Sequence, residues 1–122
     1  MAYKYFDLTD QGEVLVARFK QASILDQTII DQMSAELEQV ALEAAGNNKL
    51  LLDFRTVSFM SSAMLGKLLK LHKRCKNDKI KLKLCSISSN LMEVFKITKL
   101  DKLFDIVPDE AAGVASLGKG LH

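Results

Sequence analysis

The fold of this chain is decided by residues 50–69, LLLDFRTVSFMSSAMLGKLL. The apolar run that ends at Asp53 predicts a strand covered on both faces. A short hydrophobic step, Val57–Met60, follows a loop, and Ser61 and Ser62 then open a helix with apolar residues at helical spacing. Serine suits a helix N-terminus because its hydroxyl accepts a hydrogen bond from an otherwise unpaired backbone N–H.

A helix N-terminus is also favourable for phosphate. Its unpaired N–H groups and the macrodipole favour negative charge by roughly 0.3–2 kcal/mol. A serine hydroxyl at this position can therefore be phosphorylated without unfolding the helix. One cap needs one hydroxyl, so the pair Ser61-Ser62 contains a candidate modification site beyond the cap, although simple capping is the alternative interpretation of Ser62.

This segment resembles the signature of the STAS family, the anti-sigma factor antagonists and their relatives. In that family a strand ends in an Asp-Leu-like or Asp-Phe-like pair. A Val-x-Phe-Met/Ile/Leu step and Asp-Ser-Ser/Ala-Gly-Leu-Gly at a helix start follow it. The matching residues here are Asp53, Val57, Phe59, Met60, Ser62, Ala63, Leu65 and Gly66. Later steps, Val94–Ile97 and Leu103–Ile106, extend the resemblance over nearly the whole chain.

The resemblance places Ser62 on the family's phosphorylated serine, with Ser61 as the second choice. Ser61 stands where the family usually has Asp, and Met64 where it usually has Gly. The resemblance also implies a partner-binding surface around this serine. Its candidate residues are Asp26, Phe59, Met60, Ser61, Ala63, Met64, Lys67 and Lys70. Methionines such as Met60 and Met64 are more often adaptable core or rim residues than recognition residues, and this is the alternative interpretation for both.

By resemblance, the unphosphorylated protein would bind an anti-sigma factor that is also a serine kinase, and so release a sigma factor. Phosphorylation of Ser62 would end that binding, and a metal-dependent serine phosphatase would restore it. The alternative is a constitutive STAS scaffold, or a subunit of a signalling or transport assembly, without obligatory phosphorylation. Ser61 in place of the family Asp favours this alternative. A weaker third hypothesis is small-molecule or nucleotide binding near the Ser61 loop.

The rest of the chain predicts alternating strands and helices. We expect strands at 3–8, 14–19, 50–54, 80–85 and 105–107, with a hairpin turn at 9–12. We expect helices from a cap at Asp26 or Thr28 to about Gly46, from Ser62 to about Cys75, from Ser88 or Ser89 through Ile97, and from Pro108 onward. The predicted fold is α/β: one STAS-like domain over residues 1–122, with a mixed central sheet and about four packed helices.

The composition agrees with one small globular domain. The chain has 122 residues, of which 48% are hydrophobic and 26% are charged. No apolar run approaches the ~20 residues that span a bilayer, and the first residues lack the order of a secretory signal. We therefore expect a cytoplasmic protein without membrane insertion. Cys75 and Cys85 are expected to be reduced and mostly buried.

Catalytic motifs are missing from the sequence. His72 lies mid-helix and His122 ends the chain, so neither has a metal-ligating companion at useful spacing. The pair Gly66-Lys67 lacks the upstream glycine and the following Ser or Thr of a phosphate-binding loop. We expect a binding protein rather than an enzyme, with no cofactor and no metal.

Basic residues gather between positions 67 and 83. They are Lys67, Lys70, Lys73, Arg74, Lys76, Lys79, Lys81 and Lys83, whereas acids prevail before residue 46. A solvated surface is one interpretation, and a docking surface for an acidic protein partner is the other. Direct nucleic-acid binding is not expected, because aromatic residues are absent from this run.

Overall fold

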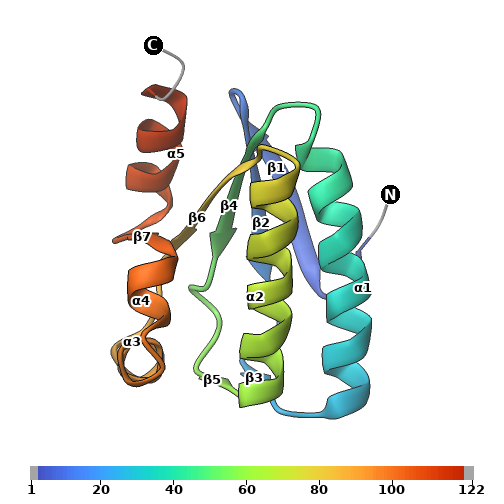
Figure 1. Cartoon of the computed structure of the whole chain (residues 1–122), viewed down its shortest axis with the longest axis vertical. Helices are drawn as coiled ribbons and strands as arrows, with labels where there is room; N and C mark the ends of the chain where they lie inside the picture. Colours follow the sequence, from blue (N-terminus) through green and yellow to red (C-terminus); the bar gives the residue numbers. More distant parts are fainter. Residues whose placement is uncertain (1–2, 120–122) are drawn as a thin grey trace.

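The computed structural model describes residues 3–119, which fold around a mixed five-stranded sheet (Figure 1). In spatial order the strands are β1 (Phe6–Gln11), β2 (Val14–Phe19), β4 (Lys49–Asp53), β6 (Lys81–Cys85) and β7 (Asp105–Val107). The β1–β2 pair is antiparallel and the other pairs are parallel. A small parallel pair joins β3 (Ser23–Ile24) to β5 (Phe59–Met60). The predicted mixed α/β sheet is confirmed.

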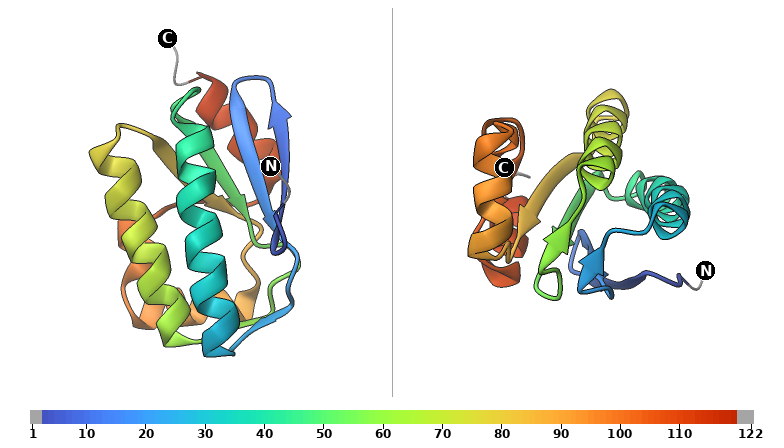
Figure 2. Two further views of the ribbon diagram at one scale, coloured as in Figure 1. Left: turned by 90° about the vertical axis from the view of Figure 1, so that its right-hand side faces the viewer. Right: turned by 90° about the horizontal axis from the view of Figure 1, so that it is seen from below.

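Helices cover both faces of the sheet (Figure 2). Two long helices, α1 (Gln27–Ala44) and α2 (Ser62–Asn77), lie side by side on one face. The other face carries α5 (Glu110–Lys119). Below α5 in Figure 1 lie α3 (Ser89–Ile97) and α4 (Leu100–Leu103), whose buried residues belong to the same large core as those of α1 and α2. Within residues 3–119 four helices exceed one turn and α4 is a single turn, which agrees with the four predicted. No helix in this range is both long and apolar enough to cross a bilayer.

Strand β4 lies at the centre of the molecule, between two apolar cores. Leu50 and Leu52 point into the large core beneath α1 and α2, whereas Leu51 points into a smaller core beneath α5. All three leucines have no exposed surface. The prediction that this strand is covered on both faces is confirmed, because side chains alternate between the faces of a strand.

The first hairpin is shifted from its predicted position. Strand β1 begins at Phe6 and continues to Gln11, and the two-residue loop Gly12-Glu13 leads into Val14. Gly12 has φ +67°, which the first position of such a tight loop requires. Residues 3–5 do not join the strand because α1 holds them: the Tyr5 N–H donates to the Glu36 carboxylate at 3.0 Å.

Caps set the helix boundaries. Asp26, not Thr28, caps α1, and its carboxylate accepts a hydrogen bond from the Ile29 N–H at 3.1 Å. Ser88 caps α3 in the same way. Pro108 lies just before α5 instead of within its first turn, because the Asp109 carboxylate accepts from the Ala112 N–H at 2.8 Å.

Candidate functional site

The candidate site lies at the end of the molecule where the N-termini of α1 and α2 meet the β3–β5 pair (Figure 2). Backbone hydrogen bonds tie the connector before α1 to the loop before α2. The Ser58 N–H donates to the Ala22 carbonyl at 2.8 Å, and the Ser61 N–H donates to the Ile24 carbonyl at 3.0 Å. The two loops therefore form one surface, with two helix N-termini favourable to negative charge.

Ser61 is the N-cap of α2. Its backbone is extended, with φ −75° and ψ 162°, and its hydroxyl accepts a hydrogen bond from the Met64 N–H at 3.4 Å. The Ser61 carbonyl accepts from the N–H groups of Met64 and Leu65. The half-buried Ser61 hydroxyl is thus engaged in starting the helix.

Ser62 is the first residue of α2 and is exposed. In the described part of the chain its hydroxyl makes no hydrogen bond. Helix geometry leaves the N–H groups of Ser62 and Ala63 without an intrahelical partner. An accessible hydroxyl therefore lies beside two available backbone donors at the positive end of a 16-residue helix.

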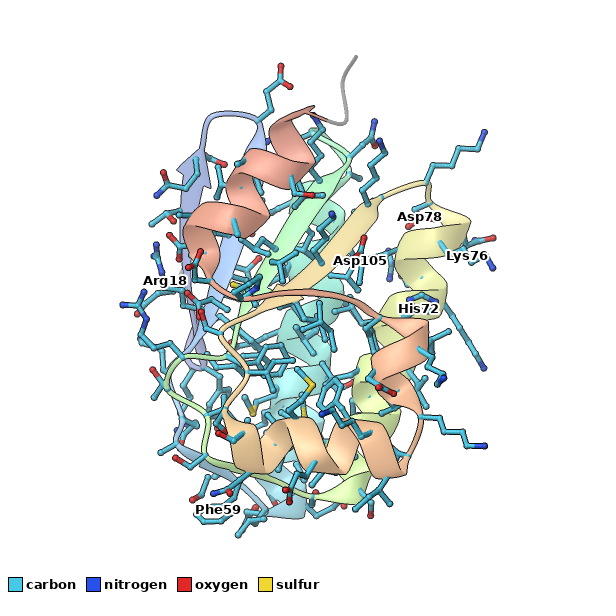
Figure 3. The ribbon with its side chains drawn as sticks, turned by 90° about the vertical axis from the view of Figure 1, so that its left-hand side faces the viewer. Arg18, Phe59, His72, Lys76, Asp78 and Asp105 are labelled. Carbon is cyan, nitrogen blue, oxygen red and sulfur yellow. The ribbon has the colours of Figure 1, made fainter. Side chains whose placement is uncertain are left out.

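Apolar side chains flank this serine. Leu25, which follows β3, is 62% exposed, and Phe59, the first residue of β5, is 57% exposed. Phe59 lies at the lower edge of the molecule in Figure 3. Asp26 and Ala63 are also exposed, although the Asp26 carboxylate is engaged as the α1 cap. Sequence reasoning did not select Leu25, whose only signal is an apolar residue directly before a cap.

The structure corrects the expectation for two methionines. Met64 has no exposed surface and Met60 is 9% exposed, so both belong to the large core. Met64 lies one turn before Leu68 on the inward face of α2. Neither side chain forms part of the surface around Ser62.

The basic residues of α2 next to α1 are paired within the molecule. The Lys67 ammonium lies 3.7 Å from the Asp31 carboxylate, and the Lys70 ammonium lies 3.2 Å from Glu38. Arg74 is 4.0 Å from the same Glu38 carboxylate. Acidic α1 packs beside basic α2, so part of the lysine run neutralises a neighbouring helix. Such exposed pairs contribute only about 0–1 kcal/mol each.

A charged cluster at the end of β4 was not predicted. The buried Asp53 carboxylate accepts a hydrogen bond from the Arg55 N–H at 2.9 Å and so stabilises the turn that follows β4. Arg18 donates two hydrogen bonds of 2.7 Å to Glu110 at the start of α5, and its Nε lies 3.9 Å from Asp53. Hydrogen bonding from Arg18 lowers the pKa of Glu110 and raises the pKa of Arg18. This cluster fastens α5 to the sheet.

The remaining titratable candidates have structural surroundings. His72 packs edge-on against Phe104 with ring centroids 5.2 Å apart, and burial lowers its pKa. Cys75 and Cys85 are buried as predicted, and burial raises their thiol pKa values to about 11 and about 12. Among residues 3–119, no three His, Cys, Asp or Glu side chains are placed to hold a metal ion. His122 lies outside the described residues.

The element order and the serine at the start of α2 define a class of small α/β domains with one antiparallel edge strand. The family model of the STAS domain matches residues 5–113. The chain therefore belongs to the STAS domain family.

Several solved structures with the same fold are described as anti-sigma factor antagonists. One from Mycobacterium paratuberculosis has a TM-score of 0.79 and 16% identity, over 92% of each chain. A STAS domain protein from Planctomyces limnophilus has a TM-score of 0.74 and 21% identity, over 92% of this chain and 96% of that one. The Bacillus cell fate determinant SpoIIAA in its phosphorylated form has a TM-score of 0.62 and 21% identity, over 88% and 95%. These identities establish a shared fold.

Proposed function

We propose that this protein is an anti-sigma factor antagonist controlled by phosphorylation of Ser62. Unphosphorylated, it binds an anti-sigma factor that is also a serine kinase, and so releases a sigma factor in the cytoplasm. It acts as a substrate and a binding surface and carries out no catalysis itself. The observation that carries the proposal is the exposed Ser62 hydroxyl, free of hydrogen bonds in the described chain, at the first position of α2.

The proposed docking surface surrounds that hydroxyl. It contains Leu25, Asp26, Phe59, Ser61 and Ala63, and it extends along α2 to Lys67 and Lys70. Leu25 and Phe59 supply exposed apolar area that a partner covers. The hydroxyl is thus placed inside the contact area, where a small chemical change has a large effect.

Phosphate at Ser62 opposes binding through charge and solvation. It adds about −1.5 to −2 charge at pH 7, which a partner must desolvate when it covers this surface. A change of ~2–3 kcal/mol weakens binding by roughly 30- to 150-fold. The free protein tolerates the phosphate because the unpaired N–H groups of Ser62 and Ala63 accept negative charge.

The similar proteins support this proposal. Antagonists of anti-sigma factors share the fold, and SpoIIAA has been solved in a phosphorylated form. In the proposed cycle a metal-dependent serine phosphatase removes the phosphate and restores binding. In this cycle the kinase and the phosphatase supply the catalytic residues, so this chain needs only an accessible serine and a docking surface.

A constitutive scaffold is the second candidate. Ser61 supplies a neutral cap where family members usually have Asp, so the acid next to the phosphoacceptor is missing. A scaffold needs the same exposed apolar surface but no phosphate. The two functions differ in whether Ser62 chemistry changes partner binding.

Partner capture from the source cell tests the proposal. We expect Ser62→Ala to retain a kinase-like anti-sigma factor persistently, and Ser62→Asp to retain at least about tenfold less. Ser61→Ala should still accept phosphate at Ser62, which distinguishes the two hydroxyls. Equal retention by Ser62→Asp and wild type, with no change after phosphatase treatment, favours the scaffold.

A further inference from the structure

A second exposed apolar feature lies at the junction of α3 and α4, which we call the α3–α4 corner (residues 96–103). Ile97 is 81% exposed and Leu103 is 44% exposed. Buried side chains attach the corner to the core. Leu100 and Phe104 are buried, and the centroid of the Phe104 ring lies 6.1 Å from that of the Phe95 ring. The exposed side chains therefore belong to a packed part of the molecule.

Three lysines accompany the two apolar residues in the sequence, and Lys96 and Lys102 directly precede Ile97 and Leu103. Lys96, Lys99 and Lys102 are exposed, and none makes an ion pair or side-chain hydrogen bond with any residue in 3–119. This distinguishes them from Lys67 and Lys70, which are paired with acids of α1. Asp101 is the one acid of the corner. The corner thus combines a net positive charge with exposed apolar side chains.

We propose that the α3–α4 corner binds a protein partner through an acidic amphipathic helix. Apolar side chains on such a helix cover Ile97 and Leu103, and its carboxylates pair with the lysine ammonium groups. The corner lacks the exposed aromatic side chains that stack on nucleic-acid bases. Its three lysines are fewer than the 4–8 basic residues typical of attraction to anionic lipid. An acidic helix matches both the charge and the apolar area.

The corner is separate from the Ser62 surface. In Figure 3 α3 runs from the side of Phe59 toward α4, and the corner lies at the far end of that helix. Binding at the corner should therefore be independent of the state of Ser62. The proposal does not rest on the proposed switch, and the protein could hold two partners at once.

An NMR titration of the full chain tests this binding. The probe is a synthetic amphipathic helix of roughly 18 residues, with leucine on one face and glutamate on the other. We expect saturable amide shifts at residues 96–103. Affinity should fall at least about fivefold for Ile97→Ser with Leu103→Ser, and equally for Lys96→Glu with Lys102→Glu. Ser62→Asp should bind as wild type.

Matched controls use residues of similar exposure elsewhere. Leu42→Ser removes a leucine that is 53% exposed on α1, and Lys79→Glu reverses an exposed lysine after α2. Both should leave the affinity unchanged. The test variants themselves should keep the amide spectrum of a folded protein.

Several outcomes overturn the proposal. One is the absence of saturable shifts below about 1 mM probe; another is a set of shifts centred on Ser62. Equal losses in the control variants would show nonspecific attraction. Binding of phosphatidylserine vesicles through the same lysines assigns the corner to membranes, and concentration-dependent association abolished by the Ile97 and Leu103 changes assigns it to a second copy of this chain.

Discussion

At the scale of single residues, the two adjacent serines have different environments. The Ser61 hydroxyl is half-buried and accepts the Met64 N–H, whereas the Ser62 hydroxyl is exposed and free in the described chain. An extended backbone at Ser61 followed by helical geometry at Ser62 produces this difference. Capping is thereby assigned to the Ser61 hydroxyl, and the Ser62 hydroxyl is left available for the proposed modification.

Stability measurements on the two serines should separate these roles. Ser61→Ala removes the cap and should lower the free energy of unfolding by about 0.5–2 kcal/mol. Ser62→Ala removes a hydroxyl that contributes no hydrogen bond to the helix, so its effect should stay within about 0.5 kcal/mol. Urea unfolding measures both. A larger loss of stability for Ser62→Ala than for Ser61→Ala would show that Ser62, and not Ser61, caps the helix.

The two cysteines should be inert in the native protein. Burial raises the pKa of Cys75 to about 11 and that of Cys85 to about 12. Because a raised pKa leaves little thiolate near neutral pH, a thiol reagent should react slowly with the folded chain and rapidly with both thiols in denaturant. Fast labelling of either cysteine in the native protein, measured by mass spectrometry, contradicts this assignment.

At the scale of elements, α5 is attached to the sheet in two ways. Its first residue, Glu110, receives two hydrogen bonds from Arg18 of β2. Further along, Gly113 packs directly on Leu51 of β4: a Cβ at Gly113 would lie 2.6 Å from a Leu51 methyl carbon. The absence of a side chain at Gly113 lets α5 approach the sheet and bury Leu51.

The Arg18–Glu110 pair should make stability depend on pH. Its hydrogen bonds lower the folded-state pKa of Glu110 below that of the unfolded chain. The stabilisation, about 1 kcal/mol, is complete above the unfolded value of about 4.3 and is lost as pH falls through the lower folded value. In urea unfolding from pH 7 to pH 3, Glu110→Gln should lose less stability on acidification than wild type. The control Glu93→Gln, exposed on α3, should follow wild type.

Because Gly113 contacts Leu51, substitutions at these two positions should have strongly non-additive effects on the free energy of unfolding. Leu51→Ala should cost about 2–5 kcal/mol because it empties part of the core beneath α5. Gly113→Ala should cost about 1–3 kcal/mol through overpacking. In the Leu51→Ala background the same change should become stabilising, since the added methyl fills the space and alanine favours a helix. Additive unfolding energies, or a loss below about 1 kcal/mol for Leu51→Ala, would contradict this packing.

At the scale of the whole molecule, local patterns predicted most of the fold. The apolar residues of α1 from Ile30 to Ala44 are buried at helical spacing, and the apolar run before Asp53 forms the central strand. The STAS-like segment placed the start of α2 at Ser62, where the structure has it. These features are encoded by neighbouring residues, through helix periodicity, caps and strand burial.

Contacts between distant residues were not predictable in the same way. Arg18 and Glu110 are 92 positions apart, and no local spacing relates them. The α1 pairs of Lys67 and Lys70 depend on how two helices pack, so the basic run alone suggested a free surface. The burial of Met64 was accessible from its spacing to Leu68, but the resemblance drew attention to its place beside the serine.

Phosphate mapping tests the central claim, that Ser62 is the regulated hydroxyl, most directly. The full chain is isolated from its own cell, with and without phosphatase treatment, and the peptide containing Ser61 and Ser62 is fragmented in a mass spectrometer. We predict one phosphate on Ser62, lost after phosphatase treatment and absent from the Ser62→Ala variant, with Ser61→Ala still modified. Phosphate confined to Ser61, or no phosphate on either serine under any growth condition, contradicts the account.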